Sequence, residues 1–261
     1  MKKIWKYRFY YYLALPGLVY FIIFHYVPMA GALIAFKDIS PFDGLQGFFD
    51  APWVGLKHFE RFTSSVYFYD VIENTLIISG LKILFGFPAP IIFALLLNEV
   101  LRMSLKRVMQ TISYLPHFIS WVVTAGMITA LLATSGGLIT ETINDFTGSS
   151  INFLGNKDYF VGILVTSHVW KTIGWSSIIY LAAMSSIDPA LYESARIDGA
   201  NRLQMAWHIT LPSIMFVIVI MFLLEIGNLL EAGFEQILLL YSPSVYKVAD
   251  IIDTFVYREG L

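Results

Sequence analysis

Five long apolar segments constrain the fold of this chain more than any other feature of its sequence. A membrane-crossing helix needs about 20 predominantly apolar residues, and only helices and closed barrels satisfy their backbone polar groups inside a bilayer. The sequence therefore predicts an all-α, polytopic integral membrane protein in which residues 1–261 form a single transmembrane domain. The five segments, to within a few residues at each end, are Leu13–Phe36, Val71–Leu97, Val108–Leu132, Phe160–Met184 and Pro212–Phe234.

The composition agrees with a membrane protein and excludes several other classes. Hydrophobic residues make up 57% of the chain and charged residues 14%, whereas soluble domains have about 45–50% and about 25%. The chain has no cysteine, which excludes disulfides and thiolate metal sites. The net charge of -2 gives no support for a nucleic-acid partner. The first segment is longer than the apolar core of a signal peptide, so we predict that it is an uncleaved span.

The positions of lysine and arginine predict the orientation, because cytoplasmic loops are enriched in them. The N-terminus and the short loop 98–107 are rich in both, so they are predicted to be cytoplasmic. Loops 37–70 and 133–159 contain fewer lysines and arginines for their length, so they are predicted to face outward. Because the spans alternate in direction, loop 185–211 is then cytoplasmic. Five spans place the C-terminus outside. The charged tail Ile237–Leu261 is not a sixth span and is expected to form an amphipathic segment at the outer interface.

Loop 185–211 has the signals of a helix–turn–helix. Asp188-Pro189 is a typical helix start, and Glu193 and Arg196 are spaced to pair on the resulting helix. Asp198-Gly199 ends that helix, since glycine adopts a left-handed cap at no steric cost. A second short helix is predicted over about Asn201–His208, with the next span starting at Pro212. Taken alone, such a loop is most simply an amphipathic connector on the membrane surface.

The spacing within this loop matches a known family. Glu193, Ala195 and Gly199, followed by Ile209-x-Leu211-Pro212, resemble the EAA signature of ABC importer permeases, with Ser194 in place of the middle alanine. The similarity extends from about Tyr12 to Leu261 and is greatest to binding-protein-dependent permeases for oligosaccharides such as aldouronates or alginate. Further segments that carry it are Asn74-Thr75-Leu76, Phe87-Pro88-Ala89-Pro90, Leu97-Asn98-Glu99, Tyr114-Leu115-Pro116 and Gly233-Phe234-Glu235-Gln236.

The resemblance implies a type I importer permease fold, in which family members have a sixth span beyond the five present here. It also implies a bacterial inner-membrane subunit with a cytoplasmic N-terminus. Its partners would be a homologous second permease, two cytoplasmic ABC ATPases, an extracellular solute-binding protein and an oligosaccharide. Since the chain lacks a phosphate-binding Gly-x-x-x-x-Gly-Lys-Ser/Thr loop, ATP and Mg are expected on the ATPase. The residues expected to couple to the ATPase are Glu193, Ser194, Ala195, Asp198, Gly199, Ala200, Leu211 and Pro212.

Polar side chains inside the spans are candidates for the translocation path. An ionised group near the centre of a span costs about 2.5–3.5 kcal/mol on insertion scales, so such residues should face the bundle interior, water or one another. Their alternative role is a structural Lys–Glu pair beside an interfacial tryptophan. The candidates, on the second, fourth and fifth spans, are Lys82, Trp170, Lys171, Trp175, Glu225, Asn228 and Glu231.

Two other classes of function remain as alternatives. An ion-coupled secondary transporter would use Lys82, Lys171 and Glu225 as a charge relay, and it would be expected to have an inverted repeat, which the sequence does not show. A membrane enzyme or sensor would need a clustered catalytic or metal constellation. The five histidines have no metal-ligand spacing, and no Gly-x-Ser-x-Gly motif occurs. We therefore predict a transport subunit with no catalytic residue and no cofactor of its own.

Overall fold

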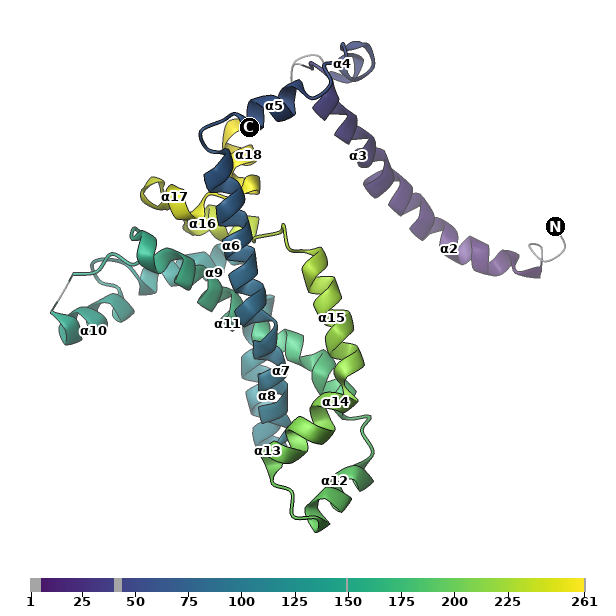
Figure 1. The fold of residues 1–261 in the computed structure, drawn as a ribbon, viewed down its shortest axis with the longest axis vertical. Coiled ribbons are helices and arrows are strands. Elements are labelled where there is room, and N and C mark those ends of the chain that lie inside the picture. The colour runs from purple at the N-terminus through teal and green to yellow at the C-terminus, as the bar shows by residue number, and fades with distance from the viewer. Residues whose placement is uncertain (1–5, 40–43, 149, 261) are drawn as a thin grey trace. The chain divides into compact units, whose positions relative to one another are not determined.

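The computed structural model describes residues 6–39, 44–148 and 150–260, and these are helical apart from short connections. No strand occurs among them, and the one β-bridge joins Lys37 to Trp53. The chain divides into two compact units, Met1–Phe68 and Tyr69–Leu261, whose elements are labelled in Figure 1. The all-α fold class predicted from the sequence is confirmed.

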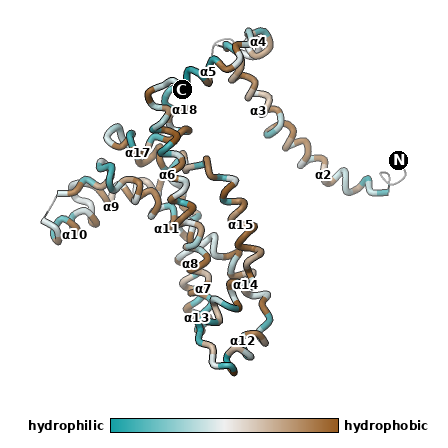
Figure 2. The backbone as a smooth tube through the Cα atoms, in the orientation of Figure 1, coloured by the Kyte–Doolittle hydropathy of each residue, from teal (hydrophilic) through white to brown (hydrophobic). Residues whose placement is uncertain are grey.

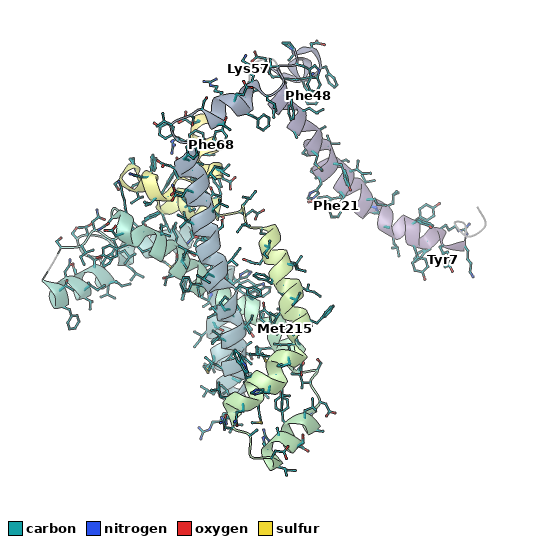
Figure 3. The ribbon with its side chains drawn as sticks, in the orientation of Figure 1. Tyr7, Phe21, Phe48, Lys57, Phe68 and Met215 are labelled. Carbon is teal, nitrogen blue, oxygen red and sulfur yellow. The ribbon has the colours of Figure 1, made fainter. Side chains whose placement is uncertain are left out.

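The first unit begins with a helix of 29 residues, Arg8–Phe36. It consists of α2 (Arg8–Phe21), a π-helical turn η1 (Ile22–Tyr26), α3 (Val27–Ala30) and a 3-10 turn η2 (Gly31–Phe36). The wide turn precedes Pro28, whose ring would clash with the carbonyl four residues earlier in a regular helix. At 1.5 Å per residue the helix is about 43 Å long, enough to cross a bilayer. None of its residues is buried in this chain, and most of its apolar side chains, such as Phe21 in Figure 3, are exposed.

The rest of the first unit is folded around one buried lysine. Helices α4 (Gly44–Asp50) and α5 (Lys57–Thr63) follow η2. The Nζ of Lys37 donates to the carbonyl oxygens of Phe48 at 2.7 Å and Phe49 at 3.2 Å, and it lies 5.2 Å from the ring centroid of Trp53. Asp38 pairs with Lys57 at 2.7 Å, and the hydrogen bond from that ammonium lowers the pKa of Asp38. This segment is therefore structured rather than a loose connection.

The second unit is built around α11 (Lys157–Met184), which packs along α7 (Pro88–Asn98) and α8 (Met103–Phe118). Helices α6 (Phe68–Gly86) and α7 form one continuous apolar helix of 31 residues, which matches the second predicted span. One core cluster contains Phe160 and Leu164 from the N-terminal part of α11, together with Ile78 of α6. A second contains Tyr180 and Met184 from the C-terminal part of α11.

Two of the predicted spans are sharply bent. The third is divided into α8 and α9 (Trp121–Leu131), which meet at 102°. The break occurs at Ile119, whose backbone is extended, and at Ser120, whose hydroxyl accepts a hydrogen bond from the N–H of Val123 as the N-cap of α9. The fifth is bent by 66° at Ile214, before α15 (Met215–Gly227). The sequence analysis predicted the positions of these two spans but neither bend.

Among the described residues, two helices are individually long and apolar enough to cross a membrane, or up to four if each bent pair is one span. The fourth predicted span, α11, has 28 residues but is not in that set. The polar side chains along it, among them Ser167, His168 and Lys171, interrupt its apolar character. Figure 2 shows the contrast with α15, which is hydrophobic along most of its length.

The C-terminal tail packs into the core, and the expected surface position is wrong for most of it. Helix α16 (Phe234–Leu240), the turn η4 (Pro243–Val245) and α17 (Tyr246–Ala249) supply four residues to the first core cluster, and a fifth follows α17; they are Ile237, Leu240, Val245, Ala249 and Ile251. The amide of Asn74 on α6 fixes the tail by donating to the carbonyls of Lys247 and Asp250, each at 3.1 Å.

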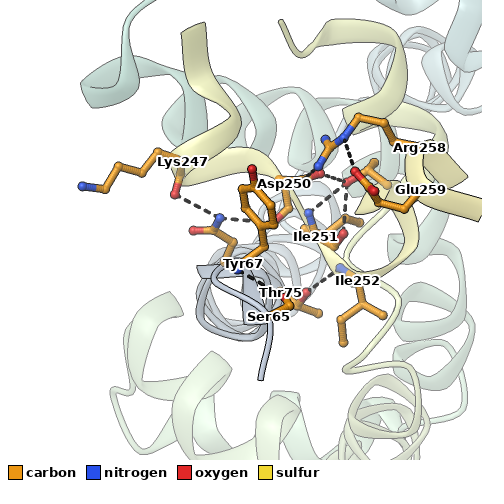
Figure 4. Close-up of polar contacts among 11 residues, drawn as sticks. Ser65, Tyr67, Thr75, Lys247, Asp250, Ile251, Ile252, Arg258 and Glu259 are labelled. Atoms are coloured by element: carbon orange, nitrogen blue, oxygen red, sulfur yellow. Dashed lines mark hydrogen bonds and ion pairs between the residues drawn. The ribbon is translucent and has the colours of Figure 1, made fainter. Parts of the chain in front are cut away.

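A buried carboxylate organises the end of the tail (Figure 4). Asp250 accepts hydrogen bonds from the hydroxyl of Thr254 at 2.8 Å and from the guanidinium of Arg258 at 2.7 Å. Both donors belong to α18 (Ile252–Gly260). The hydrogen bond to Asp250 raises the pKa of Arg258 above its ordinary value. Arg258 thus neutralises the buried charge of Asp250 within the tail.

Candidate functional sites

Helix α12 (Pro189–Ile197) begins and ends as the sequence predicts. The carboxylate of Asp188 accepts the N–H of Ala190 at 2.9 Å, with proline at the first helical position. Gly199 has φ of +82°, in the left-handed region. The N–H of Gly199 donates to the carbonyl oxygen of Arg196 at 3.1 Å, and the N–H of Ala200 donates to that of Ala195 at 2.9 Å. This pair of bonds is the Schellman arrangement of a helix end. A side chain at position 199 would strain this turn.

The second helix of the loop is longer than predicted. It runs from Arg202 to Ser213 through α13 (Arg202–Met205), the π-helical turn η3 (Ala206–Thr210) and α14 (Leu211–Ser213). Pro212 therefore lies inside a helix and does not start the span, because the wide turn before it accommodates the proline ring. Asn201 and Gln204 form a reciprocal capping box, a start that the Asn-x-x-Gln spacing could have predicted.

A cleft of about 330 Å³ separates the two helices of the loop. Four of the eight predicted coupling residues line it: Ala195, Asp198, Gly199 and Ala200. Glu193 and Ser194 are exposed on α12, and no ion pair joins Glu193 to Arg196 in the part of the chain that the structure describes. Leu211 and Pro212 lie on α14 and do not line the cleft.

Large apolar side chains project from the loop into solvent. Ile197 is 87% exposed, Leu203 77% and Trp207 66%. The sequence analysis did not single them out, although apolar residues in a polar loop could have been noticed. Exposed apolar groups clustered beside a cleft are typical of a protein-binding surface. We call Ile197, Leu203, Trp207 and the cleft the loop surface.

Two side-chain contacts connect the loop to the spans. The hydroxyl of Tyr192 on α12 lies 2.9 Å from the hydroxyl of Thr210, which is 3% exposed. Arg202 forms an exposed ion pair with Glu99 at the end of α7, at 3.6 Å. Ile214, four residues beyond Thr210, is buried in the second core cluster. Thr210 therefore contacts both α12, through the hydroxyl of Tyr192, and the bend that precedes α15, through the N–H of Ile214.

Lys82 is buried within the second span, and its ammonium donates hydrogen bonds to neighbouring segments. Its Nζ donates to the carbonyl of Ala232 at 2.7 Å and to the side-chain oxygen of Gln236 at 2.6 Å. The amide nitrogen of Gln236 donates in turn to the carbonyl of Leu164 and the hydroxyl of Ser167, both at 2.8 Å. One polar network thus joins α6, α11 and α16.

Lys171 occupies a similar position at the bend between α8 and α9. Its ammonium donates to the carbonyl oxygens of Pro116 at 3.0 Å, His117 at 3.3 Å and Ile119. It also lies 5.3 Å from the ring centroid of Trp121. Neither Lys171 nor Lys82 forms an ion pair with a glutamate in the described part of the chain, so the alternative of a structural Lys–Glu pair is wrong.

The other predicted path residues are spread over two helices and the segment that follows α15. Trp170 and Trp175 on α11 are each 43% exposed, and Trp175 stacks on His117 with ring centroids 4.6 Å apart. Trp170 lines two apolar cavities of about 780 and 660 Å³. Glu225 is half-buried on α15, and Asn228 and Glu231 are exposed just beyond it. No metal-binding cluster occurs among the described residues.

Broken membrane helices around a polar central helix, together with a separate apolar loop surface, define the class of a transport subunit that works with a partner. Residues 86–260 match the family described as "Binding-protein-dependent transport system inner membrane component". The chain belongs to this family.

Curated relatives and a solved structure agree with this membership. The chain is 47% identical over 259 residues to the polygalacturonan/rhamnogalacturonan transport system permease protein YteP of Bacillus subtilis (strain 168), covering 99% of this chain and 80% of the relative. It is 44% identical to Protein LplB of the same organism, covering 96% and 78%. The permease of a bacterial ABC transporter for import of the acidic polysaccharide alginate superimposes with a TM-score of 0.90 at 43% identity, covering 100% and 86%.

These findings confirm the family resemblance derived from the loop motif. The chain is a bacterial membrane permease subunit of a sugar ABC importer rather than an enzyme. The alternative of an ion-coupled secondary transporter finds no support in them.

Proposed function

We propose that this permease imports an oligosaccharide and that the loop surface docks on a separate cytoplasmic ABC ATPase. The observation that carries the proposal is the loop surface itself, a rigidly capped helix–turn–helix with a cleft and exposed Ile197, Leu203 and Trp207. Glu193, Ser194 and the four cleft residues would contact the ATPase directly. Leu211 and Pro212 would act through the connection to α15. ATP and Mg would bind to the ATPase, whose closure moves the permease.

The assembly proposed for this chain follows that of its relatives. A solved structure at 42% identity and a TM-score of 0.89 is an alginate ABC transporter in complex with a pentasaccharide-bound periplasmic protein. By similarity, an extracellular solute-binding protein would deliver the cargo to this permease. Because one permease carries one such loop, two ATPases require two permeases, and the second is proposed to be a homologous chain. This arrangement places the N-terminus and loop 185–211 in the cytoplasm, in agreement with the lysine and arginine distribution.

The cargo is proposed to be an acidic oligosaccharide. YteP is named for polygalacturonan, and the solved importer for alginate, so both names refer to polymers of sugar acids. In this chain the buried ammonium groups of Lys82 and Lys171 bond to carbonyl and amide oxygens, which are neutral. Among the described residues neither lysine has a carboxylate at ion-pair distance, although Glu235 lies near enough to interact with the charge of Lys171. The positive field of the two lysines, without direct contact by the enclosed Lys82, would favour an anion over a neutral sugar in the path. Half-buried Glu225 and exposed Asn228 and Glu231 would then contact hydroxyl groups.

The test of docking is a charge reversal on α12. We expect Glu193→Lys to leave the chain in the membrane and to abolish both co-purification of the ATPase and ATP-dependent uptake in reconstituted vesicles. The control is Asp145→Lys, which reverses an exposed acid on α10 (Leu138–Thr147), outside the loop. An intact, active complex from the Glu193→Lys variant would overturn the proposal.

The cargo is tested with the same vesicles. Uptake of an oligogalacturonate should exceed that of a neutral oligosaccharide of equal length when both are supplied with the binding protein. Equal or preferential uptake of the neutral sugar would contradict the assignment of an acidic cargo while leaving the docking proposal standing.

A further inference from the structure

The helix break between α15 and α16 is the feature of the second unit that the coupling proposal does not use. Helix α15 ends at Gly227 and α16 starts at Phe234, so six residues, 228–233, lie between the two helices inside the region predicted as the fifth span. Their backbone forms short turns at its start and passes into α16 at Gly233. Non-helical backbone at membrane depth persists only where its polar groups find partners in the protein or in a water-filled path. We call residues 228–233 the break segment.

The two sides of the break segment have different surroundings. Ala232 is fully buried in the first core cluster, whereas Asn228, Leu230 and Glu231 are exposed. The segment thus presents polar side chains outward and a backbone carbonyl inward. The inward carbonyl, on Ala232, is the one that accepts from Lys82 at 2.7 Å.

Lys82 holds this segment through the network that joins α6, α11 and α16. Its side chain is buried, with 5% of the residue exposed, and two of its three N–H groups are directed at Ala232 and Gln236. Gly233, with φ of +92°, allows the backbone to approach so closely that a Cβ there would lie 2.5 Å from the ammonium. The Lys82 ammonium therefore supplies a hydrogen-bond donor to the Ala232 carbonyl and fixes the distance between the break segment and α6.

We infer that Lys82 is a positioning residue that fixes the break segment and thereby sets how Asn228 and Glu231 meet the saccharide. It does not itself bind the cargo, because its ammonium is enclosed and its bonds point to the protein. The inference rests on the proposed function, since it assigns to the break segment the contact with the transported sugar. Removal of the ammonium would leave the Ala232 carbonyl and the Gln236 oxygen without a donor, and the segment would move to find water.

The absence of cysteine from the chain makes the segment directly measurable. A single reporter, Leu230→Cys, can be labelled with a water-soluble maleimide in the assembled complex, and Asp145→Cys on α10 is the control reporter. With Lys82→Met, we expect labelling of the Leu230 reporter to accelerate and the KM for saccharide uptake to rise, each by about tenfold, since a lost hydrogen bond to a buried charge has effects of that order. The control reporter should label at an unchanged rate.

Two further variants separate positioning from general destabilisation. Gln236→Leu keeps the ammonium and its bond to Ala232, so its effect on KM should have the same direction and be smaller. The double variant Lys82→Met with Gln236→Met removes donor and acceptor together, which is often nearly neutral for stability, yet it still frees the Ala232 carbonyl. It should therefore restore the amount of assembled complex without restoring KM.

The outcomes distinguish this inference from the proposed function. If wild-type vesicles show no ATP-dependent uptake, the proposed function fails. If they transport, and both the KM and the labelling rate of the Leu230 reporter are unchanged by Lys82→Met and by the double variant, the positioning role is wrong. If the Lys82→Met complex does not assemble, the Gln236→Leu and double variants test the positioning role through the KM for uptake and the labelling rate of the Leu230 reporter. Unchanged values in both variants would show that the role is wrong.

Discussion

The hydrogen bond between Tyr192 and Thr210 offers a sharp test of how α12 is connected to the spans. Tyr192→Phe removes one hydroxyl and leaves the ring in place. A neutral hydrogen bond contributes about 0.5–1.5 kcal/mol net. Thr210 is not left without a partner, because its hydroxyl also lies 3.4 Å from the carbonyl of Met205. We therefore expect a loss of about 1 kcal/mol in the free energy that couples α12 to the helix preceding α15, or about fivefold.

The assay is the number of ATP molecules hydrolysed per saccharide imported by the reconstituted complex. Tyr192→Phe should raise this number several-fold while the ATPase still co-purifies, because Tyr192 is not part of the loop surface proposed for docking. Ser186→Ala is the matched control in the same loop, since the exposed Ser186 hydroxyl donates to the carbonyl of Ala183, away from α12 and from the predicted coupling residues. In a double-mutant cycle, Thr210→Val should add little to Tyr192→Phe. Fully additive effects, or an unchanged ratio of ATP to saccharide, would refute the connection.

Three further predictions concern other parts of the chain. Ile197→Ser and Leu203→Ser should each weaken ATPase binding by tenfold or more, since burying such a side chain contributes about 1.5–3 kcal/mol; unchanged affinity in a pull-down titration would remove them from the loop surface. Gly174→Ala should reduce the amount of folded chain in detergent-extracted membranes, because a Cβ there would lie 2.0 Å from a backbone oxygen of α8; normal yield would contradict that contact. The lowered pKa of Asp38 means that its pairing with Lys57 is fully present above the ordinary value of 3.8 and is lost as the pH falls through the folded value. Limited proteolysis of residues 37–68 should therefore increase in acid, and Lys57→Met should reduce this pH dependence.

The sequence predicted well those features that depend on neighbouring residues. Asp188-Pro189 and Gly199 act within one helical turn, so a cap or a left-handed stop can be read from the spacing alone. The family motif in loop 185–211 is local in the same way. The loop surface was only partly predicted, because the exposure of Ile197 and Leu203 depends on how α12 and α13 are turned relative to each other.

The bends were not predicted, because a straight and a bent span have the same apolar content. Nothing in the hydropathy of residues 108–132 distinguishes one helix from two helices meeting at 102°. Proline was a weak guide, since the second span continues through Pro88 and Pro90 while the fifth breaks two residues after Pro212. The position of a break depends on whether another element can satisfy the freed backbone groups.

This dependence also explains why the hydrogen-bond partners of the two lysines could not be predicted. From the sequence, Lys82 and Lys171 were expected to face the translocation path or, as the alternative, to pair with a glutamate, because opposite charges are the partners that a sequence reveals. In the structure each lysine instead donates hydrogen bonds to backbone carbonyls at a helix break. Lys171 of α11 bonds to carbonyls between α8 and α9. Lys82 of α6 bonds to one between α15 and α16. Break and lysine are interdependent, since the carbonyls would be unsatisfied without the ammonium and the charge would be unpaired without the carbonyls. A buried lysine in a span of this fold is therefore evidence for a broken helix beside it.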